Sequence, residues 1–122
     1  MRTEKSIVYK KAFDFSVRIV NLHKYLSDEK REYTLGKQVL RSGTSIGANI
    51  REGLEGQSRK DFVAKLSIAL KEAAETEYWL ELLNATEILE ERIAKSLLTD
   101  VKEIIEILNS IIKTTRNSVD SK

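Results

Sequence analysis

Four segments of this chain carry apolar residues at alternating intervals of three and four positions. The clearest of the four contains Val8, Ala12, Phe15, Ile19, Leu22 and Leu26. Side chains at that spacing share one face of an α-helix, so each segment is predicted to be an amphipathic helix with one buried face. No segment shows the two-residue alternation that is typical of a half-buried strand. The 122 residues also include no proline, which would interrupt helices of this length.

The helices are predicted over residues 6–27, 34–54, 59–85 and 90–116. Their connections are short, and short connections make consecutive helices antiparallel neighbours. We therefore expect residues 1–122 to form a single all-α domain, an antiparallel up-down-up-down four-helix bundle, which is large enough to bury a core without disulfides or a metal. One alternative concerns the break near Thr86–Leu89, because a continuous helix there would make a long hairpin instead of a bundle.

The inward-facing residues of the other helices follow from the same spacing. They are Leu35, Val39, Gly43, Ile46, Ile50 and Leu54 in the second helix, Phe62, Leu66, Ala69, Ala73, Leu80 and Leu83 in the third, and Ile93, Leu97, Val101, Ile104, Leu108 and Ile111 in the fourth. The second helix also contains Gly43 and Gly47, and a glycine inside a helix costs about 1 kcal/mol relative to alanine. Close approach of a neighbouring helix is the simplest compensation.

A polar stripe runs beside the apolar one on the second predicted helix. It consists of Gln38, Ser42, Ser45, Asn49 and Glu52. In an antiparallel hairpin that turns just before the third helix, Arg41 lies level with Glu75. We therefore expect a partly buried Arg41–Glu75 ion pair, with Ser45 or Asn49 completing its hydrogen bonds. Removing one partner would cost about 3–5 kcal/mol if the pair were fully buried. Glu72 is interpreted instead as part of a solvated charged face.

Residues that commonly carry catalysis or bind metals are scarce. The chain has no cysteine and one histidine, His23. Di-iron sites in helical bundles use Glu-x-x-His pairs, but the residue three positions before His23 is Val20. No nucleophile elbow and no phosphate-binding glycine motif is present. The sequence therefore predicts no catalytic residue, metal or cofactor, and the chain is expected not to be an enzyme.

The expected compartment is the cytoplasm. The sequence contains no apolar run of the about 18 residues that a membrane span requires. Its start, MRTEKSIVYKKAF, is interrupted by charged residues and lacks the apolar core of a signal peptide. The absence of cysteine fits a reducing environment. We therefore expect a cytoplasmic protein with no membrane partner.

Positive charge is concentrated in the first half of the chain. Residues 1–60 hold 13 basic and 7 acidic side chains, whereas residues 61–122 hold 8 and 12. The predicted topology brings the start of the first helix, the second connection and the end of the last helix to one end of the bundle. A basic end attracts a phosphate backbone, but it also favours solubility, and a net charge of +2 is no strong nucleic-acid signature. The candidate phosphate contacts there are Lys10, Lys11, Arg59, Lys60, Lys113 and Arg116.

The segment from Leu40 to Gly53, LRSGTSIGANIREG, resembles the signature of the 23S rRNA intervening sequence protein family, whose members are small bacterial four-helix bundles. The similarity continues through Ser58–Phe62, Leu66–Ala69 and Glu75–Glu77 and covers essentially the whole chain. It implies a protomer that assembles into a homopentamer. It also implies association with RNA or DNA, because related accessory proteins of diversity-generating retroelements bind nucleic acid and contact a reverse transcriptase.

An oligomer would use the small and aromatic residues outside the main apolar stripes. Gly43 and Gly47 are candidates for the interface, although they equally suit a helix contact within the protomer. Tyr78 and Trp79 are further candidates, since aromatic residues are enriched at interfaces, or they cover the bundle's own edge. The expected function is therefore that of a non-enzymatic, oligomeric protein that binds RNA or DNA through a basic bundle end. The alternative is a protein–protein scaffold or accessory subunit, for example of a reverse transcriptase.

Overall fold

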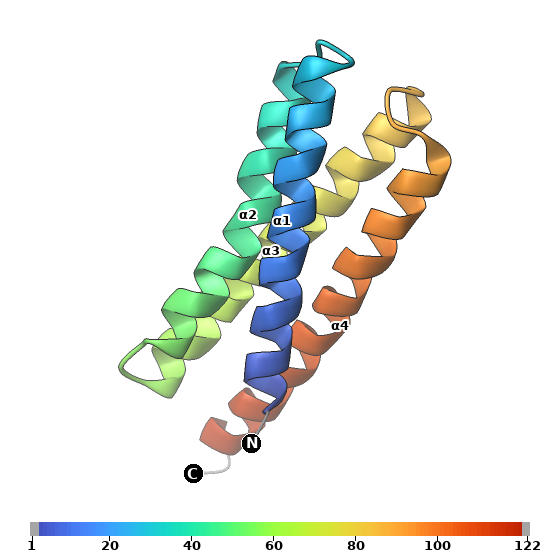
Figure 1. The fold of residues 1–122 in the computed structure, drawn as a ribbon. Coiled ribbons are helices and arrows are strands. Elements are labelled where there is room, and N and C mark those ends of the chain that lie inside the picture. The colour runs from blue at the N-terminus through green and yellow to red at the C-terminus, as the bar shows by residue number, and fades with distance from the viewer. Residues whose placement is uncertain (1–2, 121–122) are drawn as a thin grey trace.

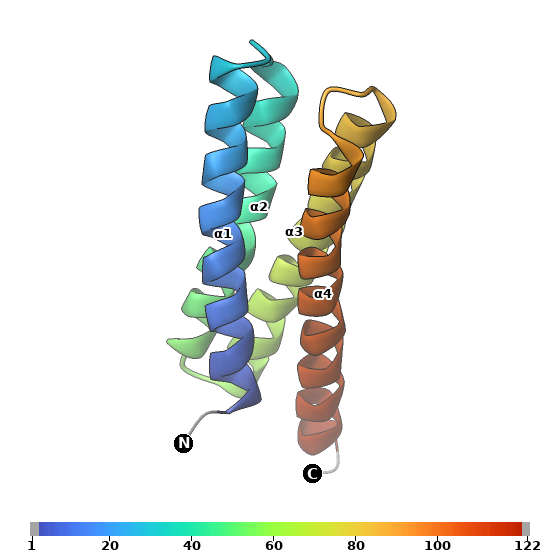
Figure 2. The same ribbon diagram turned by 45° about the vertical axis from the view of Figure 1, so that its right-hand side comes forward.

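The computed structural model describes residues 3–120, and this range contains four α-helices. They are α1 (Glu4–Asp28), α2 (Thr34–Leu54), α3 (Arg59–Ala85) and α4 (Glu91–Asp120). Successive helices run antiparallel, each packs against the next, and α4 also contacts α1 (Figure 1). Figure 2 shows α1 beside α2, and α3 running from the lower end of α2 to the upper end of α4. The predicted all-α four-helix bundle is therefore confirmed.

The starts of α1 and α3 are fixed by side-chain caps. The hydroxyl of Thr3 accepts a hydrogen bond from the Ser6 amide at 3.2 Å, and the Ser6 hydroxyl accepts one from the Thr3 amide at 3.1 Å. This reciprocal capping box starts α1 at Glu4, two residues before the predicted start. At the start of α3, the Ser58 hydroxyl accepts a hydrogen bond from the Asp61 amide at 3.1 Å.

The chain reverses between α3 and α4, so the alternative of one continuous helix is excluded. The amides of Ile88 and Leu89 both donate to the carbonyl oxygen of Leu83, at 3.1 and 3.0 Å. Glu87 has a φ of 62°, in the left-handed region that commonly follows the last turn of a helix. Leu89 is buried and anchors this turn to the core.

The buried residues of α1 and α3 include every position that the apolar spacing predicted. For the other helices, the prediction for Leu54 was wrong, and those for Leu35 and Ile93 hold only in part, because both residues are half-buried against the core. Leu54 is 41% exposed, because α2 ends there and its preceding residue, Gly53, turns inward against Leu66. Ile93 is only half-buried at the start of α4, where its neighbour Ala94 occupies the core position.

Gly43 and Gly47 of α2 lie against α1 within the same chain. A Cβ atom at Gly43 would lie 2.8 Å from Cγ1 of Ile19, whereas one at Gly47 would lie 3.5 Å from Oγ of Ser16. Both glycines are buried. The expected close approach of a neighbouring helix is therefore present, but the assignment of Gly43 and Gly47 to an oligomer interface was wrong, because α1 already covers them.

One polar contact crosses the core between α2 and α3. Ser42 and Thr76 are fully buried, and their hydroxyl groups lie 2.9 Å apart. The Thr76 hydroxyl also lies 2.8 Å from the carbonyl oxygen of Glu72. The polar stripe of α2 therefore divides, with Ser42 in the core and its other members nearer the surface.

Within residues 3–120, no helix combines the length and the apolar character that crossing a lipid bilayer requires.

Candidate nucleic-acid interface

The start of α1, the turn between α2 and α3 and the end of α4 meet at one end of the bundle (Figure 1). We call this end, formed by residues 3–14, 51–65 and 110–118, the basic pole. It contains the six candidate phosphate contacts, namely Lys10, Lys11, Arg59, Lys60, Lys113 and Arg116. The opposite end consists of the turns at residues 29–33 and 86–90.

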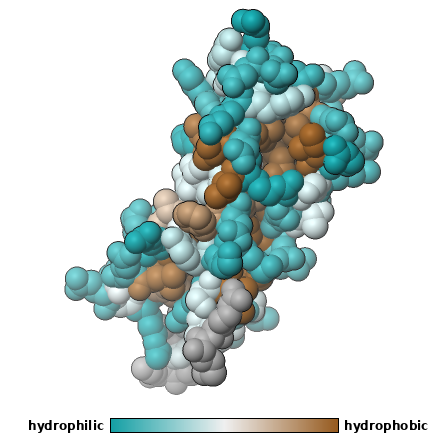
Figure 3. Space-filling model, viewed as in Figure 1, coloured by the Kyte–Doolittle hydropathy of each residue, from teal (hydrophilic) through white to brown (hydrophobic). Residues whose placement is uncertain are grey.

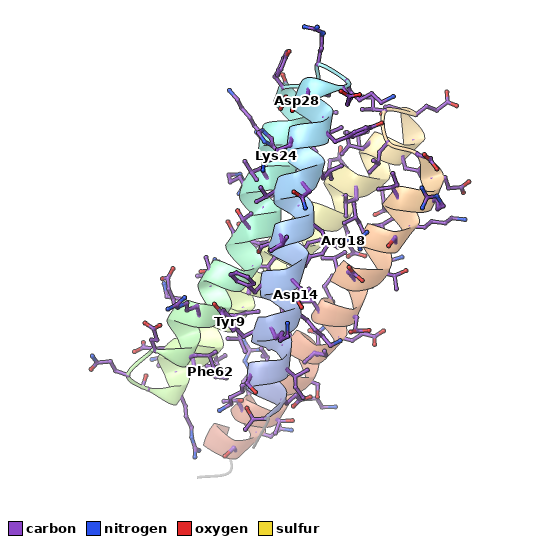
Figure 4. All side chains as sticks on the ribbon, viewed as in Figure 1. Tyr9, Asp14, Arg18, Lys24, Asp28 and Phe62 are labelled. Atoms are coloured by element: carbon purple, nitrogen blue, oxygen red, sulfur yellow. The ribbon has the colours of Figure 1, made fainter. Side chains whose placement is uncertain are left out.

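Two of the six candidates are already paired with carboxylates. Lys10 contacts Asp14 one helical turn away, with 2.9 Å between Nζ and Oδ2, and Lys11 forms an ion pair with Glu103 of α4. Figure 4 labels Asp14 on α1, further from the N-terminus than Tyr9. Lys10 and Lys11 are therefore partly neutralised at the margin of the pole.

The other four candidates have no such partner. Among the side chains that the structure describes, no carboxylate lies within 4.0 Å of Arg59, Lys60, Lys113 or Arg116. Lys5 belongs with them, since its ammonium group lies 4.7 Å from the centre of the Phe62 ring. Sequence reasoning did not select Lys5, because its position depends on how α1 and α3 meet in space.

The acidic residues of the pole are mostly engaged within it. Glu52 accepts a hydrogen bond from Lys65 at 2.9 Å, and Glu55 accepts one from Arg51 at 3.3 Å. The pKa of Arg51 is raised, chiefly by the Glu55 carboxylate and then by the Tyr9 hydroxyl, so the guanidinium stays charged. The positive charge of the remaining cations is therefore left available to an anionic ligand.

Away from the pole, the structure brings Arg41 and Glu75 together at the expected register. Arg41 donates to Glu75 and also to Glu72, the latter at 3.2 Å. Trp79 donates its indole N–H to the same Glu75 oxygen at 3.0 Å. The interpretation of Glu72 as a solvated residue was wrong, because its side chain is only 18% exposed and faces Arg41.

The expected roles of Ser45 and Asn49 in that network were also wrong. The Ser45 hydroxyl donates to the carbonyl oxygen of Arg41 at 2.6 Å, and the Asn49 amide donates to the carbonyl oxygen of Ser45 at 2.9 Å. Both side chains therefore bond to the backbone of their own helix. This is a common outcome for short polar side chains within helices.

Replacing Arg41 with alanine is expected to lower the free energy of unfolding by less than about 1 kcal/mol. The Arg41 side chain is 50% exposed, so solvent screens the pair and the cost for a fully buried pair does not apply. Urea denaturation measures the change, with Lys71→Ala as a control on the exposed surface of α3. A loss above about 3 kcal/mol would show instead that the pair behaves as buried.

The remaining candidates lie apart from the pole. Tyr78 is 58% exposed, and its ring meets that of Trp79 edge-on, with 5.1 Å between the ring centres. Trp79 is half-buried at the edge of α3. His23 is half-buried where α1 faces Gly36 of α2. Within residues 3–120, no three His, Cys, Asp or Glu side chains form a group that could hold a metal ion.

This chain is similar to known proteins both in sequence family and in fold. Residues 4–110 match the family described as 23S rRNA-intervening sequence protein. A crystal structure of a protein with unknown function from the S23 ribosomal protein family of Bacteroides thetaiotaomicron is 55% identical, with a TM-score of 0.90 over 91% of this chain and 99% of that one. No curated protein matches the chain. The resemblance of the Leu40–Gly53 segment is thereby confirmed, and the chain belongs to the 23S rRNA-intervening sequence protein family.

Proposed function

We propose that this chain is a non-enzymatic, oligomeric protein of the cytoplasm that binds RNA or DNA through its basic pole. The observation that carries the proposal is the group of pole cations that have no carboxylate partner among the described side chains. They are Lys5, Arg59, Lys60, Lys113 and Arg116. Cations that are not neutralised within the protein gain most from a phosphate backbone, because binding releases the counterions of the nucleic acid.

The chemistry of the pole favours binding without strong sequence preference. Lysine and arginine contacts to phosphates carry no base information, so they position a strand without reading it. Lys10 and Lys11 lie at the margin of this surface and would contribute by exchanging Asp14 and Glu103 for phosphates. RNA and DNA of different sequence are therefore expected to bind with similar affinity.

A salt series tests this function. Binding of a duplex DNA and a structured RNA, measured by fluorescence anisotropy between about 50 and 300 mM salt, should weaken steeply as salt rises. Five phosphate contacts per protomer correspond to a slope of about −4.5 in log K against log salt on duplex DNA. Affinity that does not change with salt, or no binding at the lowest salt, would refute the proposal.

Exposed apolar and aromatic residues on the surface also favour binding to another protein chain. Phe13, Val17 and Val20 form an apolar stripe on the outer side of α1, with 56%, 48% and 37% of each residue exposed. Figure 3 shows apolar surface interrupting the hydrophilic side that has α1 at the front. The exposed Tyr78 and the half-buried Trp79 beside it add a second aromatic site on α3. These sites support the homopentamer implied by the family resemblance, and they equally suit an accessory subunit that binds a partner such as a reverse transcriptase.

The mass of the protein in solution distinguishes an oligomer from a monomer that binds a different protein. In analytical ultracentrifugation, the wild-type chain is expected to sediment well above the monomer mass of 13.9 kDa. Replacing Phe13 and Val17 with aspartate should dissociate it, because the charges would be buried without partners. Tyr78→Asp tests the second site in the same way. A wild-type chain that sediments as a monomer would support the accessory-subunit alternative and contradict the oligomer.

A further inference from the structure

A pocket of about 570 Å³ opens at the basic pole, between the start of α1, the turn after α2 and the end of α4. Two cationic side chains line it, those of Lys5 and Arg59. Hydroxyl groups from Ser58, Thr114 and Ser118 also line it. No aspartate or glutamate is among the described residues of its wall, so the charged side chains of this lining are all positive.

Neighbouring residues hold both cations of the pocket in place. The Lys5 ammonium lies above the ring of Phe62, which Figure 4 labels beside the turn between α2 and α3. The Arg59 guanidinium donates to the Ser118 hydroxyl at 3.0 Å. Because packing and hydrogen bonding already restrict these long side chains, an anion between them would bind with less loss of side-chain entropy than at a free surface cation.

The wall of the pocket is only partly polar. Leu54 lines it and is 41% exposed, although the apolar spacing of α2 assigned that residue to the core. The volume lies within the range of about 300–1,000 Å³ that small-molecule sites occupy. The pocket is therefore larger than one phosphate group requires, and it offers an apolar surface beside its cations.

We propose that this pocket binds one phosphate-bearing nucleotide, with Lys5 and Arg59 on the phosphate and Leu54 against the sugar and base. The proposal rests on the nucleic-acid binding proposed above and assigns one nucleotide of the bound strand to a defined place. The pocket differs in this respect from the rest of the pole, where Lys60, Lys113 and Arg116 contact phosphates from an open surface.

Titration of the full chain with adenosine 5′-monophosphate tests the pocket, with amide NMR resonances as the readout. The nucleotide is expected to shift the resonances of Gly53, Gly56 and Ser58, whereas adenosine, which lacks the phosphate, should not. Arg59→Gln is expected to weaken the nucleotide about tenfold, because it removes a charged hydrogen-bond donor. Its matched control, Arg92→Gln, makes the same substitution at an exposed arginine near the start of α4, at the opposite end of the bundle, and should change affinity less than about twofold.

Three results would overturn the pocket assignment. They are equal shifts with adenosine and the nucleotide, no shifts at the pocket amides, or equal effects of Arg59→Gln and Arg92→Gln. If the chain binds RNA but gives one of these results, the pocket assignment is refuted and the proposed function stands. If the pocket binds the nucleotide but the chain binds no longer RNA or DNA, the pocket assignment stands and the proposed function is refuted. Oligonucleotides with and without a 5′-phosphate then distinguish a strand end from an internal nucleotide.

Discussion

Replacing Arg59 and Lys60 together with glutamate is expected to weaken binding of RNA and duplex DNA about 100-fold at moderate salt. The double change removes two phosphate contacts and adds two negative charges at the centre of the pole. It should also make the slope of log K against log salt shallower by about two, one for each lost contact. Both side chains are exposed, so the fold should be unaffected.

The matched control reverses two cations at the other end of the bundle. Lys24 lies near the end of α1 and Lys37 near the start of α2, and both are exposed. Lys24→Glu with Lys37→Glu produces the same change in net charge as the pole variant, yet it should weaken binding less than about fivefold, through long-range electrostatics alone. Similar losses in the two double variants would mean that net charge, and not the pole, determines binding.

Replacing Gly43 with leucine is expected to lower the free energy of unfolding by about 3 kcal/mol or more. Already the first added carbon, the Cβ, would lie 2.8 Å from Cγ1 and 2.9 Å from Cγ2 of Ile19. Ile19 is branched at Cβ and fully buried, so it has no alternative rotamer that clears the space. The helices α1 and α2 would therefore have to separate. Urea denaturation monitored by circular dichroism measures the loss.

Gly47→Ala is the control for this prediction, because it lies one turn further along the same helix face. A Cβ atom there would be 3.5 Å from the Ser16 hydroxyl and 3.6 Å from the Ala12 backbone, which are ordinary contacts. Alanine should then stabilise the protein by up to about 1 kcal/mol through its helix propensity. If Gly47→Ala and Gly43→Leu destabilise equally, the tight contact between α1 and α2 is not specific to Gly43.

The apolar spacing was sufficient to predict the fold and most of the core. It placed Phe15 and Ile19 in α1 and Leu80 in α3 at buried positions, because a helix of 3.6 residues per turn places such residues on one face. The same rule failed for Leu54, since it applies only where the helix continues. The spacing cannot show that the end of a helix leaves a residue such as Leu54 without a neighbour to cover it.

The contacts between helices were less predictable than the helices themselves. The register of an antiparallel hairpin was enough to bring Arg41 level with Glu75. The sequence does not give the rotation of each helix about its own axis. This rotation determines that Glu72 also faces Arg41. The pair formed by Lys5 and Phe62 depends on how α1 and α3 meet at the pole, which no local pattern records.

The most direct test of the pole as the nucleic-acid interface is hydrogen–deuterium exchange of the wild-type protein with and without a structured RNA. Exchange is expected to slow in the turn at residues 53–58 and near the end of α4, at residues 110–118, and to stay unchanged at the opposite end. Slower exchange confined to residues 29–33 and 86–90 would contradict the assignment, because those turns lie at the end of the bundle away from the pole (Figure 1).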